Sequence, residues 1–171
     1  YCASYRREAG TYGKETRGMV RLHQFDKVEL VKIVAPETSE DEHERLARDV
    51  ADIFEALELP YRVMLLCSGD TSFAAAKCYD FEVWSPGTGT WLECSSCSNF
   101  GDFQARRMNL RFRRGPQAKA EFPHTLNASG VALPRTFATL LENHQTARGT
   151  VRIPQALRPY VGGLEEIAPR A

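Results

Sequence analysis

Apolar side chains recur at the spacing of one helix face between residues 46 and 57. They are Leu46, Val50, Ile53, Phe54 and Leu57. Repeats of three and four residues put such side chains on one stripe of an α-helix. Ser39 and Glu42 have the form of a capping box that would start this helix, and Pro60 would end it. We therefore predict one amphipathic helix here.

Extended segments are predicted on both sides of this helix. They are Cys2 to Arg7, Val20 to Val34, Tyr61 to Cys67, Tyr79 to Trp84, Thr90 to Cys97 and Phe122 to Ala128. The short apolar run from Tyr61 reads as a buried strand. Pro86-Gly87-Thr88-Gly89 predicts a hairpin turn between two of the strands. A polar, glycine-bearing connection at residues 10–18 is too long for a tight turn and could close over a ligand.

Two further patterns complete the secondary structure. Met108, Leu110 and Phe112 alternate with polar residues, which predicts another strand. Residues 132–144 predict a helix, with an apolar face formed by Leu133, Phe137, Leu140 and Leu141. Hairpin-linked strands with interspersed helices indicate the α+β class, with an antiparallel β-sheet flanked by helices. A chain of 171 residues is long enough for one sizeable core, so we predict a single domain.

Composition and charge narrow the classes of partner. Lys and Arg number 22, as do Asp and Glu, so no net basic field indicates nucleic-acid binding. A basic run remains, formed by Arg106, Arg107, Arg111, Arg113 and Arg114. It could face RNA phosphates, or it could be the solvated edge of a strand. No apolar run is long enough to cross a membrane, so we expect no membrane partner.

The cysteines are five in number and lie in apolar or strand-like sequence: Cys2, Cys67, Cys78, Cys94 and Cys97. An odd, scattered set favours reduced thiols and a cytoplasmic location over a disulfide framework. Cys94 and Cys97 form one Cys-x-x-Cys pair, which could serve a metal or redox site or could simply fill a strand. The chain begins with Tyr1 inside a predicted strand, as a fragment of a longer protein would.

Charged residues alternate along the first two extended segments. Arg6 and Glu8 would project to one side of their strand, as would Lys27 and Glu29 of theirs. Such a face is either solvated or built around a charged ligand.

Two later segments also combine groups that suit phosphates. Glu93 and Ser96 lie three residues apart at a strand end and could share a hard cation such as Mg²⁺, although serine-rich strand ends are also ordinary turns. Residues 126–130 run into a helix that opens with Pro134 and Arg135, which would place backbone amides and a guanidinium at one point. The alternative is a helix start with a surface arginine.

The amino-acid sequences of these segments resemble those of the seryl-tRNA synthetases, a family of class II aminoacyl-tRNA synthetases. The runs are Tyr5-Arg6-Arg7-Glu8-Ala9-Gly10, His23-Gln24-Phe25-Asp26-Lys27-Val28-Glu29, Ser95-Ser96-Cys97-Ser98-Asn99-Phe100 and Asp102-Phe103-Gln104-Ala105-Arg106-Arg107. The resemblance extends over essentially the whole chain. It implies a partial class II catalytic core that contains motifs 2 and 3.

The resemblance also implies site residues. Arg6 and Arg135 are the expected catalytic residues, at the α- and γ-phosphates. The expected ATP contacts are Arg6, Arg7, Glu8, Leu22, Glu93, Cys94, Ser95, Ser96 and Arg135. Glu93 and Ser96 would hold Mg²⁺, and serine would be bound by Glu29, Asn127 and Ser129. Cys94 and the pair Leu133-Pro134 depart from the residues usual in the family.

The activity implied by the resemblance is serine–tRNA ligation. L-serine and ATP would give seryl-adenylate, and the seryl group would pass to tRNA(Ser). The family's N-terminal tRNA-binding arm and its motif 1, which forms a homodimer, have no counterpart in this sequence, so the chain alone is not expected to charge tRNA. Two alternatives stay open: a related ligase that loads an amino acid onto a carrier protein, and a non-catalytic paralogue.

Overall fold

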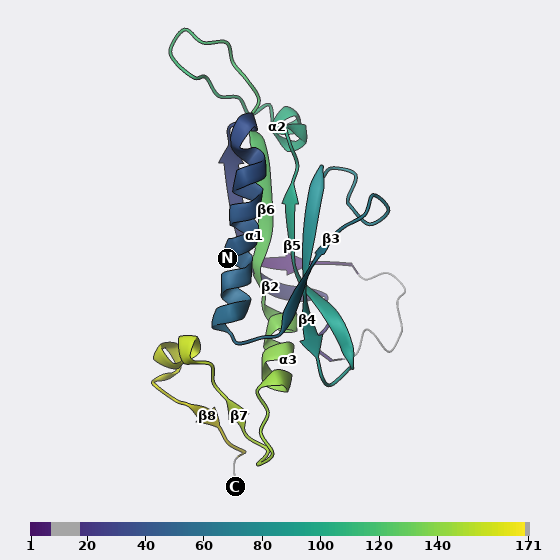
Figure 1. Ribbon diagram of the computed structural model, residues 1–171, viewed down its shortest axis with the longest axis vertical. Helices are drawn as coiled ribbons and strands as arrows, with labels where there is room; N and C mark the ends of the chain where they lie inside the picture. Colours follow the sequence, from purple (N-terminus) through teal and green to yellow (C-terminus); the bar gives the residue numbers. More distant parts are fainter. Residues whose placement is uncertain (8–17, 170–171) are drawn as a thin grey trace.

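The structure is a computed structural model that describes residues 1–7 and 18–169. Its centre is an antiparallel sheet in the order β1-β2-β6-β5-β4-β3 (Figure 1). The strands are β1 (Cys2–Tyr5), β2 (Gln24–Val34), β3 (Tyr61–Leu65), β4 (Lys77–Ser85), β5 (Thr90–Asn99) and β6 (His124–Ala132). The predicted α+β class is therefore confirmed, as is the hairpin between β4 and β5.

Helix α1 (Ser39–Ala56) lies along one face of this sheet and forms the core with it (Figure 1). The largest buried side chains of the contact are Leu46, Val50, Phe54, Phe81, Val83 and Leu126. Each side chain of this size contributes about 1.5–3 kcal/mol when it leaves water. His43 adds a polar link, because its Nε2 lies 3.0 Å from the Cys97 carbonyl and its ring stacks on Tyr79.

The opposite face of the sheet is available for the functional site. Cys97 and Ala128 pair across β5 and β6 and are both buried beneath α1. Because successive side chains of a strand point to opposite faces, Ser96, Asn127 and Ser129 project to the other side.

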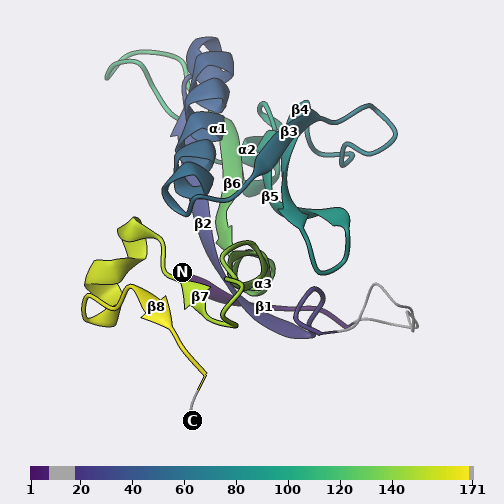
Figure 2. The same cartoon turned by 60° about the horizontal axis from the view of Figure 1, so that its bottom comes forward.

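Two shorter helices and a C-terminal hairpin complete the fold. They are α2 (Phe103–Met108), α3 (Leu133–Asn143), β7 (Val151–Arg152), β8 (Glu166–Ile167) and the 3₁₀ segments Pro36–Thr38 and Gln155–Val161. The α2 helix lies at one end of the sheet, and α3 and the C-terminal hairpin lie at the other (Figure 2). No helix in residues 1–7 and 18–169 is long and apolar enough to cross a membrane.

The start of α1 differs from the predicted capping box. The 3₁₀ turn Pro36–Thr38 runs directly into the helix, and the N-cap residue Thr38 makes no side-chain cap bond. Ser39 instead has its hydroxyl 2.8 Å from His124 Nδ1, and Glu42 pairs with Lys32. The preceding turn already engages the Ser39 amide, so the helix start needs no reciprocal cap there.

Strand β3 was predicted to be buried and to extend to Cys67, and both predictions were wrong. It ends at Leu65 and forms the edge of the sheet. Val63, Met64 and Leu65 are 46%, 40% and 64% exposed. A short apolar run cannot distinguish a central strand from an edge strand, because the neighbours that bury it come from elsewhere in the chain.

The predicted strand through residues 108–112 is also wrong. Met108 ends α2, and Asn109 closes that helix in the left-handed conformation with φ of 54°. Phe112 keeps only an isolated bridge to Glu121. Ala105 is fully buried and fixes the helix against the sheet, which outweighs the local alternation that follows.

Helix α3 forms as predicted, but with another face inward. Thr136 and Thr139 are buried, whereas Leu133 and Phe137 are 39% and 47% exposed. The helix is held against the β4–β5 hairpin by polar contacts, among them a 2.8 Å bond from Asn143 Nδ2 to the Trp84 carbonyl. Of the predicted apolar face, Leu140 still packs partly buried against the core.

Candidate active site

A pocket of about 160 Å³ opens where the end of β1, the start of β2, the middle of β5 and the junction of β6 with α3 meet. It is lined by Arg6, Met19, Val20, Leu22, Phe25, Lys27, Glu93, Cys94, Ser95, Ser129, Ala132, Pro134 and Arg135. Arg6, Glu93 and Arg135, which come from the three segments predicted to carry site residues, therefore share one pocket.

Two β-bulges aim side chains at this pocket. The pairing of β4 with β5 shifts between Phe81 and Glu82, which pair with Ser95 and Glu93, so Cys94 is the extra residue. Cys94 is buried on the core side, while Glu93 pairs with Glu82 on the open face. The β2–β6 pairing shifts in the same way between Val28 and Glu29. Bulges of this kind re-aim side chains and are frequent beside active sites.

Arg135 lies in the first turn of α3 and is tied to two backbone carbonyls. Its Nε donates to the Val20 carbonyl at 3.0 Å, and its Nη1 donates to the Glu93 carbonyl at 2.6 Å. The Glu93 carboxylate lies 3.8 Å away. Pro134 precedes it at a position where the missing N–H would have no helical partner. The guanidinium is thus fixed at the positive end of the helix dipole.

Glu93 is in an unusual electrostatic environment. Partial desolvation and then the nearby Asp80 carboxylate raise the pKa of Glu93, although its side chain is 52% exposed. Glu82 adds to the effect, whereas Arg135 and Arg6 oppose it. Asp80 and Glu93 repel each other across the strands, whereas the charge of Glu82 is partly offset by its ion pair with Arg62 at 2.5 Å. A cation placed among them would lower this repulsion.

A second group of polar side chains links β2 to β6. Lys27 Nζ forms an ion pair with Glu29 Oε2 at 2.6 Å and donates to the Ser129 hydroxyl at 3.3 Å. The Ser95 hydroxyl bonds to the Ser129 carbonyl. Glu29 Oε2 is buried and has no hydrogen bond of regular geometry among the described residues. It therefore keeps accepting capacity for a donor from a ligand.

Arg6 lines the pocket directly after the end of β1. Its amide donates to the His23 carbonyl at 2.8 Å, which extends the β1–β2 pairing by one bond. Its guanidinium carbon lies 4.5 Å from the centre of the Phe25 ring. A guanidinium on an aromatic face is held in place but keeps its charge.

The structure brings most of the predicted site residues together. Arg6, Leu22, Glu93, Cys94, Ser95, Ser129 and Arg135 line the pocket. Ser96, Asn127 and Glu29 lie on the same strands outside its lining. Ser96 is paired with Asp80 and bonds to Cys78 Sγ at 3.2 Å. Arg7 is exposed beyond β1 and is not among the lining residues, and Glu8 lies outside the described residues.

The pocket also contains residues that the prediction of the site omitted. Lys27 is the most important, and its position two residues before Glu29 was a usable signal. Phe25 lies in the same run. Asp80 and Glu82 act on Glu93 from β4, which no local pattern near Glu93 could reveal.

Metal clusters and disulfides are not part of the described structure. Within residues 1–7 and 18–169, no three His, Cys, Asp or Glu side chains are placed to hold a metal ion. All five cysteines are free, and Cys78, Cys94 and Cys97 are buried. Cys94 and Cys97 belong to β5 and to the hydrophobic core, as expected of side chains that fill a strand.

Curated relatives match nearly the entire chain. It is 59% identical over 167 residues to "Serine--tRNA ligase" of Desulforudis audaxviator (strain MP104C), covering 98% of this chain and 39% of that protein. It is 60% identical over 162 residues to the protein of the same name from Cyanothece sp. (strain PCC 7425 / ATCC 29141), covering 95% and 38%. The chain thus spans about two fifths of the length of these relatives.

Solved structures share the fold. A seryl-tRNA synthetase from Pyrococcus horikoshii complexed with ATP superposes with a TM-score of 0.93 at 47% identity, over 99% of this chain and 38% of that one. A cytoplasmic serine–tRNA ligase from Naegleria fowleri in complex with AMP gives 0.91 at 34% identity, over 99% and 40%.

The family model for the tRNA synthetase class II core domain (G, H, P, S and T) matches residues 1–144. This range includes the whole six-stranded sheet, the pocket and α3. The chain therefore belongs to the class II tRNA synthetase core family.

Proposed function

We propose that this chain is the catalytic-core portion of a serine–tRNA ligase. The observation that carries the proposal is the convergence of Arg6, Glu93 and Arg135 on one pocket, in a chain about 60% identical to proteins of that name. In this reaction a serine carboxylate oxygen bonds to the α-phosphorus of ATP and the bond to pyrophosphate breaks. A ribose hydroxyl of tRNA(Ser) then attacks the seryl carbonyl, and AMP leaves.

ATP is the nucleotide that the pocket best accommodates. Arg6 and Arg135 both line the pocket and supply positive charge for phosphate oxygens. The Phe25 ring and Leu22 supply an apolar surface for a base. Two solved relatives were crystallised with ATP and with AMP, which supports this assignment. The main catalytic contribution would be positioning and charge stabilisation at the α-phosphate.

Glu93 and Ser96 are the proposed Mg²⁺ ligands. The donor set fits a hard cation, because a carboxylate and a hydroxyl offer oxygen atoms. Desolvation is the main cause of the raised pKa of Glu93, and the Asp80 carboxylate adds negative charge that a cation would relieve. Bound Mg²⁺ would offset charge on the phosphate oxygens during adenylate formation. With few protein ligands, most of its coordination would come from ATP and water.

Serine is proposed to bind beside the Lys27–Glu29–Ser129 group. The buried Glu29 oxygen can accept a hydrogen bond from the serine ammonium or hydroxyl. The Ser129 hydroxyl and the Asn127 amide are small polar groups on the neighbouring strand β6. A polar pocket of this kind rejects apolar amino acids, because these would leave its buried groups without partners.

The remaining features of the enzyme are proposed from its relatives. The chain covers 39% of the Desulforudis protein, so most of that relative lies outside the matched region. We place the tRNA-binding arm and the motif 1 segment of a homodimer in that remainder. The free cysteines agree with a reducing, cytoplasmic location.

The test is ATP–pyrophosphate exchange by the full-length protein. We expect exchange that depends on serine and on Mg²⁺, and seryl transfer to tRNA(Ser). A full-length protein that binds neither ATP nor serine would be a non-catalytic paralogue. Exchange followed by loading of a carrier protein, with no transfer to tRNA, would identify the alternative ligase.

A further inference from the structure

The largest concentration of positive charge outside the pocket lies in residues 102–122, here called the basic segment. Its basic residues are Arg106, Arg107, Arg111, Arg113, Arg114 and Lys119. Its acidic residues are Asp102 and Glu121. Six positive and two negative charges leave a surplus of four, whereas the whole chain has a formal net charge of zero. The positive charge of this protein is therefore local.

The basic segment projects from the body of the protein. It connects β5 to β6 through α2 and a long loop, and the loop extends beyond the sheet and beyond the start of α1 (Figure 1). This placement removes one alternative for the basic run, the solvated edge of a strand, because residues 109–122 are not part of the sheet.

Aromatic rings hold several of these guanidinium groups in place. Arg106 and Arg111 lie 4.6 Å and 4.5 Å from the centre of the Phe122 ring. Arg107 lies 5.2 Å from the Phe103 ring. Such contacts fix an arginine without neutralising it, and they leave its planar donor groups available to an anion.

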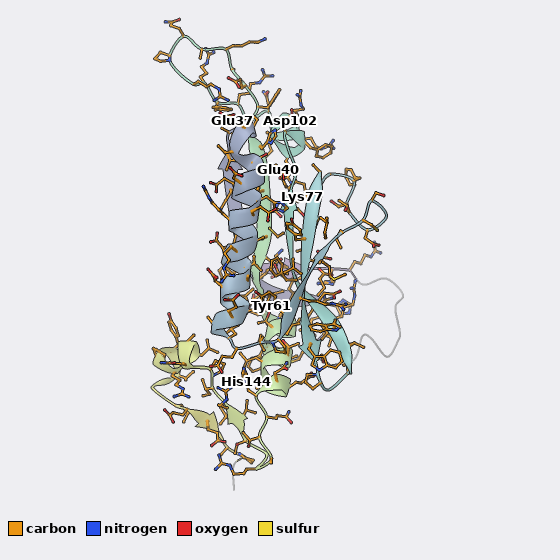
Figure 3. All side chains as sticks on the ribbon, viewed as in Figure 1. Glu37, Glu40, Tyr61, Lys77, Asp102 and His144 are labelled. Carbon is orange, nitrogen blue, oxygen red and sulfur yellow. The ribbon has the colours of Figure 1, made fainter. Side chains whose placement is uncertain are left out.

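Neighbouring carboxylates cancel only part of the charge. Arg106 pairs with Asp102, and Arg114 pairs with Glu37 and Glu121. Figure 3 shows Glu37 and Asp102 at the end of the molecule from which the loop projects.

The acidic first turns of α1 are engaged by other cations: Lys77 pairs with Glu40 and Glu44, and Lys32 with Glu42. In contrast, four exposed side chains of the basic segment have no ion pair to a described residue: Arg107, Arg111, Arg113 and Lys119.

We propose that the basic segment is a contact surface for the phosphodiester backbone of RNA. The phosphates of an RNA backbone suit a segment with several exposed arginines, because guanidinium groups bind phosphates with two parallel hydrogen bonds. The inference rests on the proposed function, in which the RNA is tRNA(Ser). The segment follows the Asn99 end of β5, whereas Glu93 lies toward the other end of that strand. It therefore contributes to tRNA binding and not to ATP or serine binding.

The experiment uses the triple variant Arg107→Gln, Arg113→Gln, Lys119→Gln of the full-length protein. These side chains have no ion pair to lose, but Arg107 loses its contact with the Phe103 ring and Arg113 its bond to the Ala118 carbonyl. Thermal unfolding of the variant is therefore measured beside that of the wild type. A control matched in charge, Arg45→Gln, Arg48→Gln, Arg148→Gln, alters side chains that are 69%, 62% and 75% exposed elsewhere on the surface. Each of these arginines has an ion-pair partner, so the thermal unfolding of the control is measured as well.

We expect the triple variant to keep wild-type serine-dependent ATP–pyrophosphate exchange, which needs no tRNA. Its KM for tRNA(Ser) should rise about tenfold, and the slope of log affinity against log salt should fall by about 2. The control variant should match wild type in all three measurements.

Other results would overturn the proposal. Unchanged tRNA affinity and salt dependence would do so, as would a change in oligomeric state without a change in tRNA affinity, which would assign the segment to a protein contact. Absence of exchange in the wild type would refute the proposed function instead. Direct binding of a labelled tRNA(Ser) transcript to the wild-type and triple-variant proteins would then still decide the RNA contact.

Discussion

Glu142 Oε2 accepts a 2.6 Å hydrogen bond from the hydroxyl of Ser85, which links the end of α3 to the end of β4. The same oxygen accepts a 3.1 Å bond from the Gly87 amide in the hairpin turn. A carboxylate in the last turn of a helix is disfavoured by the helix dipole, so these bonds offset an intrinsic cost. Arg135 lies in the first turn of the same helix, so the link also fixes the position of Arg135 relative to β5.

We predict that Glu142→Ala weakens both the fold and ATP binding. Ser85 is fully buried and would lose its acceptor, which costs about 1–3 kcal/mol of unfolding free energy. The KM for ATP in pyrophosphate exchange should rise about tenfold, because a 1 Å displacement of a positioned group has effects of that order or larger. Glu142→Gln should rescue both quantities, since an amide oxygen can accept both bonds. Equal behaviour of the two variants would contradict the positioning role.

The hairpin turn depends on a close approach at Gly87. A Cβ added there would lie 2.8 Å from Glu142 Oε1. We predict that Gly87→Ala lowers the free energy of unfolding by about 1–3 kcal/mol, measured by chemical denaturation, because it forces Glu142 away. Gly115→Ala is the control, since a Cβ there meets nothing within 4 Å. Similar stability of the two variants would show that Glu142 moves freely.

Arg135→Ala should abolish activation with only a modest loss of stability. We expect serine-dependent exchange to fall by 10² or more, since removal of one preorganised donor to a transition-state charge has about this effect. The unfolding free energy should fall by about 1–2 kcal/mol, because the bonds to the Val20 and Glu93 carbonyls disappear. Arg45→Ala is the control for removing an exposed arginine. Exchange at the wild-type rate in Arg135→Ala would remove this residue from the site.

The ionised Glu93 side chain should lower the free energy of unfolding although Mg²⁺-dependent exchange requires it. Its pKa is raised above the ordinary 4.5, first by burial and then by Asp80. The Glu93 carboxyl therefore stays protonated to higher pH in the folded state than in the unfolded state. Its contribution to the free energy of unfolding falls as pH rises from about 4.5 through the raised pKa. We predict that Glu93→Gln gains stability relative to wild type across that range and loses Mg²⁺-dependent exchange. Thermal unfolding against pH is the measurement, and parallel wild-type and variant profiles would refute the charge conflict.

Cysteine reactivity should follow burial. Burial raises the pKa of Cys94 to about 11 and that of Cys97 to about 12, so neither forms thiolate at neutral pH. Cys2 and Cys67 are exposed. Brief alkylation of the native protein, read by peptide mass spectrometry, should therefore modify Cys2 and Cys67 and leave Cys94 and Cys97 unmodified. Rapid labelling of Cys97 would show that β5 opens.

Much of the secondary structure followed from local pattern. The apolar repeat from Leu46 to Leu57 predicted α1, because an amphipathic stripe reports the period of a helix directly. Pro86 to Gly89 predicted the β4–β5 turn for a similarly local reason. Errors arose where burial depended on distant partners, as at the exposed strand β3 and at the inward-facing Thr136 and Thr139 of α3.

The chemistry of the site divides in the same way. The sequence by itself determined which groups were available, because the runs around Arg6, Glu93 and Arg135 could be read and compared with a family. Only the tertiary structure decided how they combine. A bulge at Cys94 turns Glu93 to the open face, and desolvation together with Asp80 on the next strand raises the pKa of Glu93. Helix α3 brings Arg135 to the Glu93 carbonyl. These effects join residues far apart in the chain, so their physical cause is strand register and helix packing, which no local pattern contains.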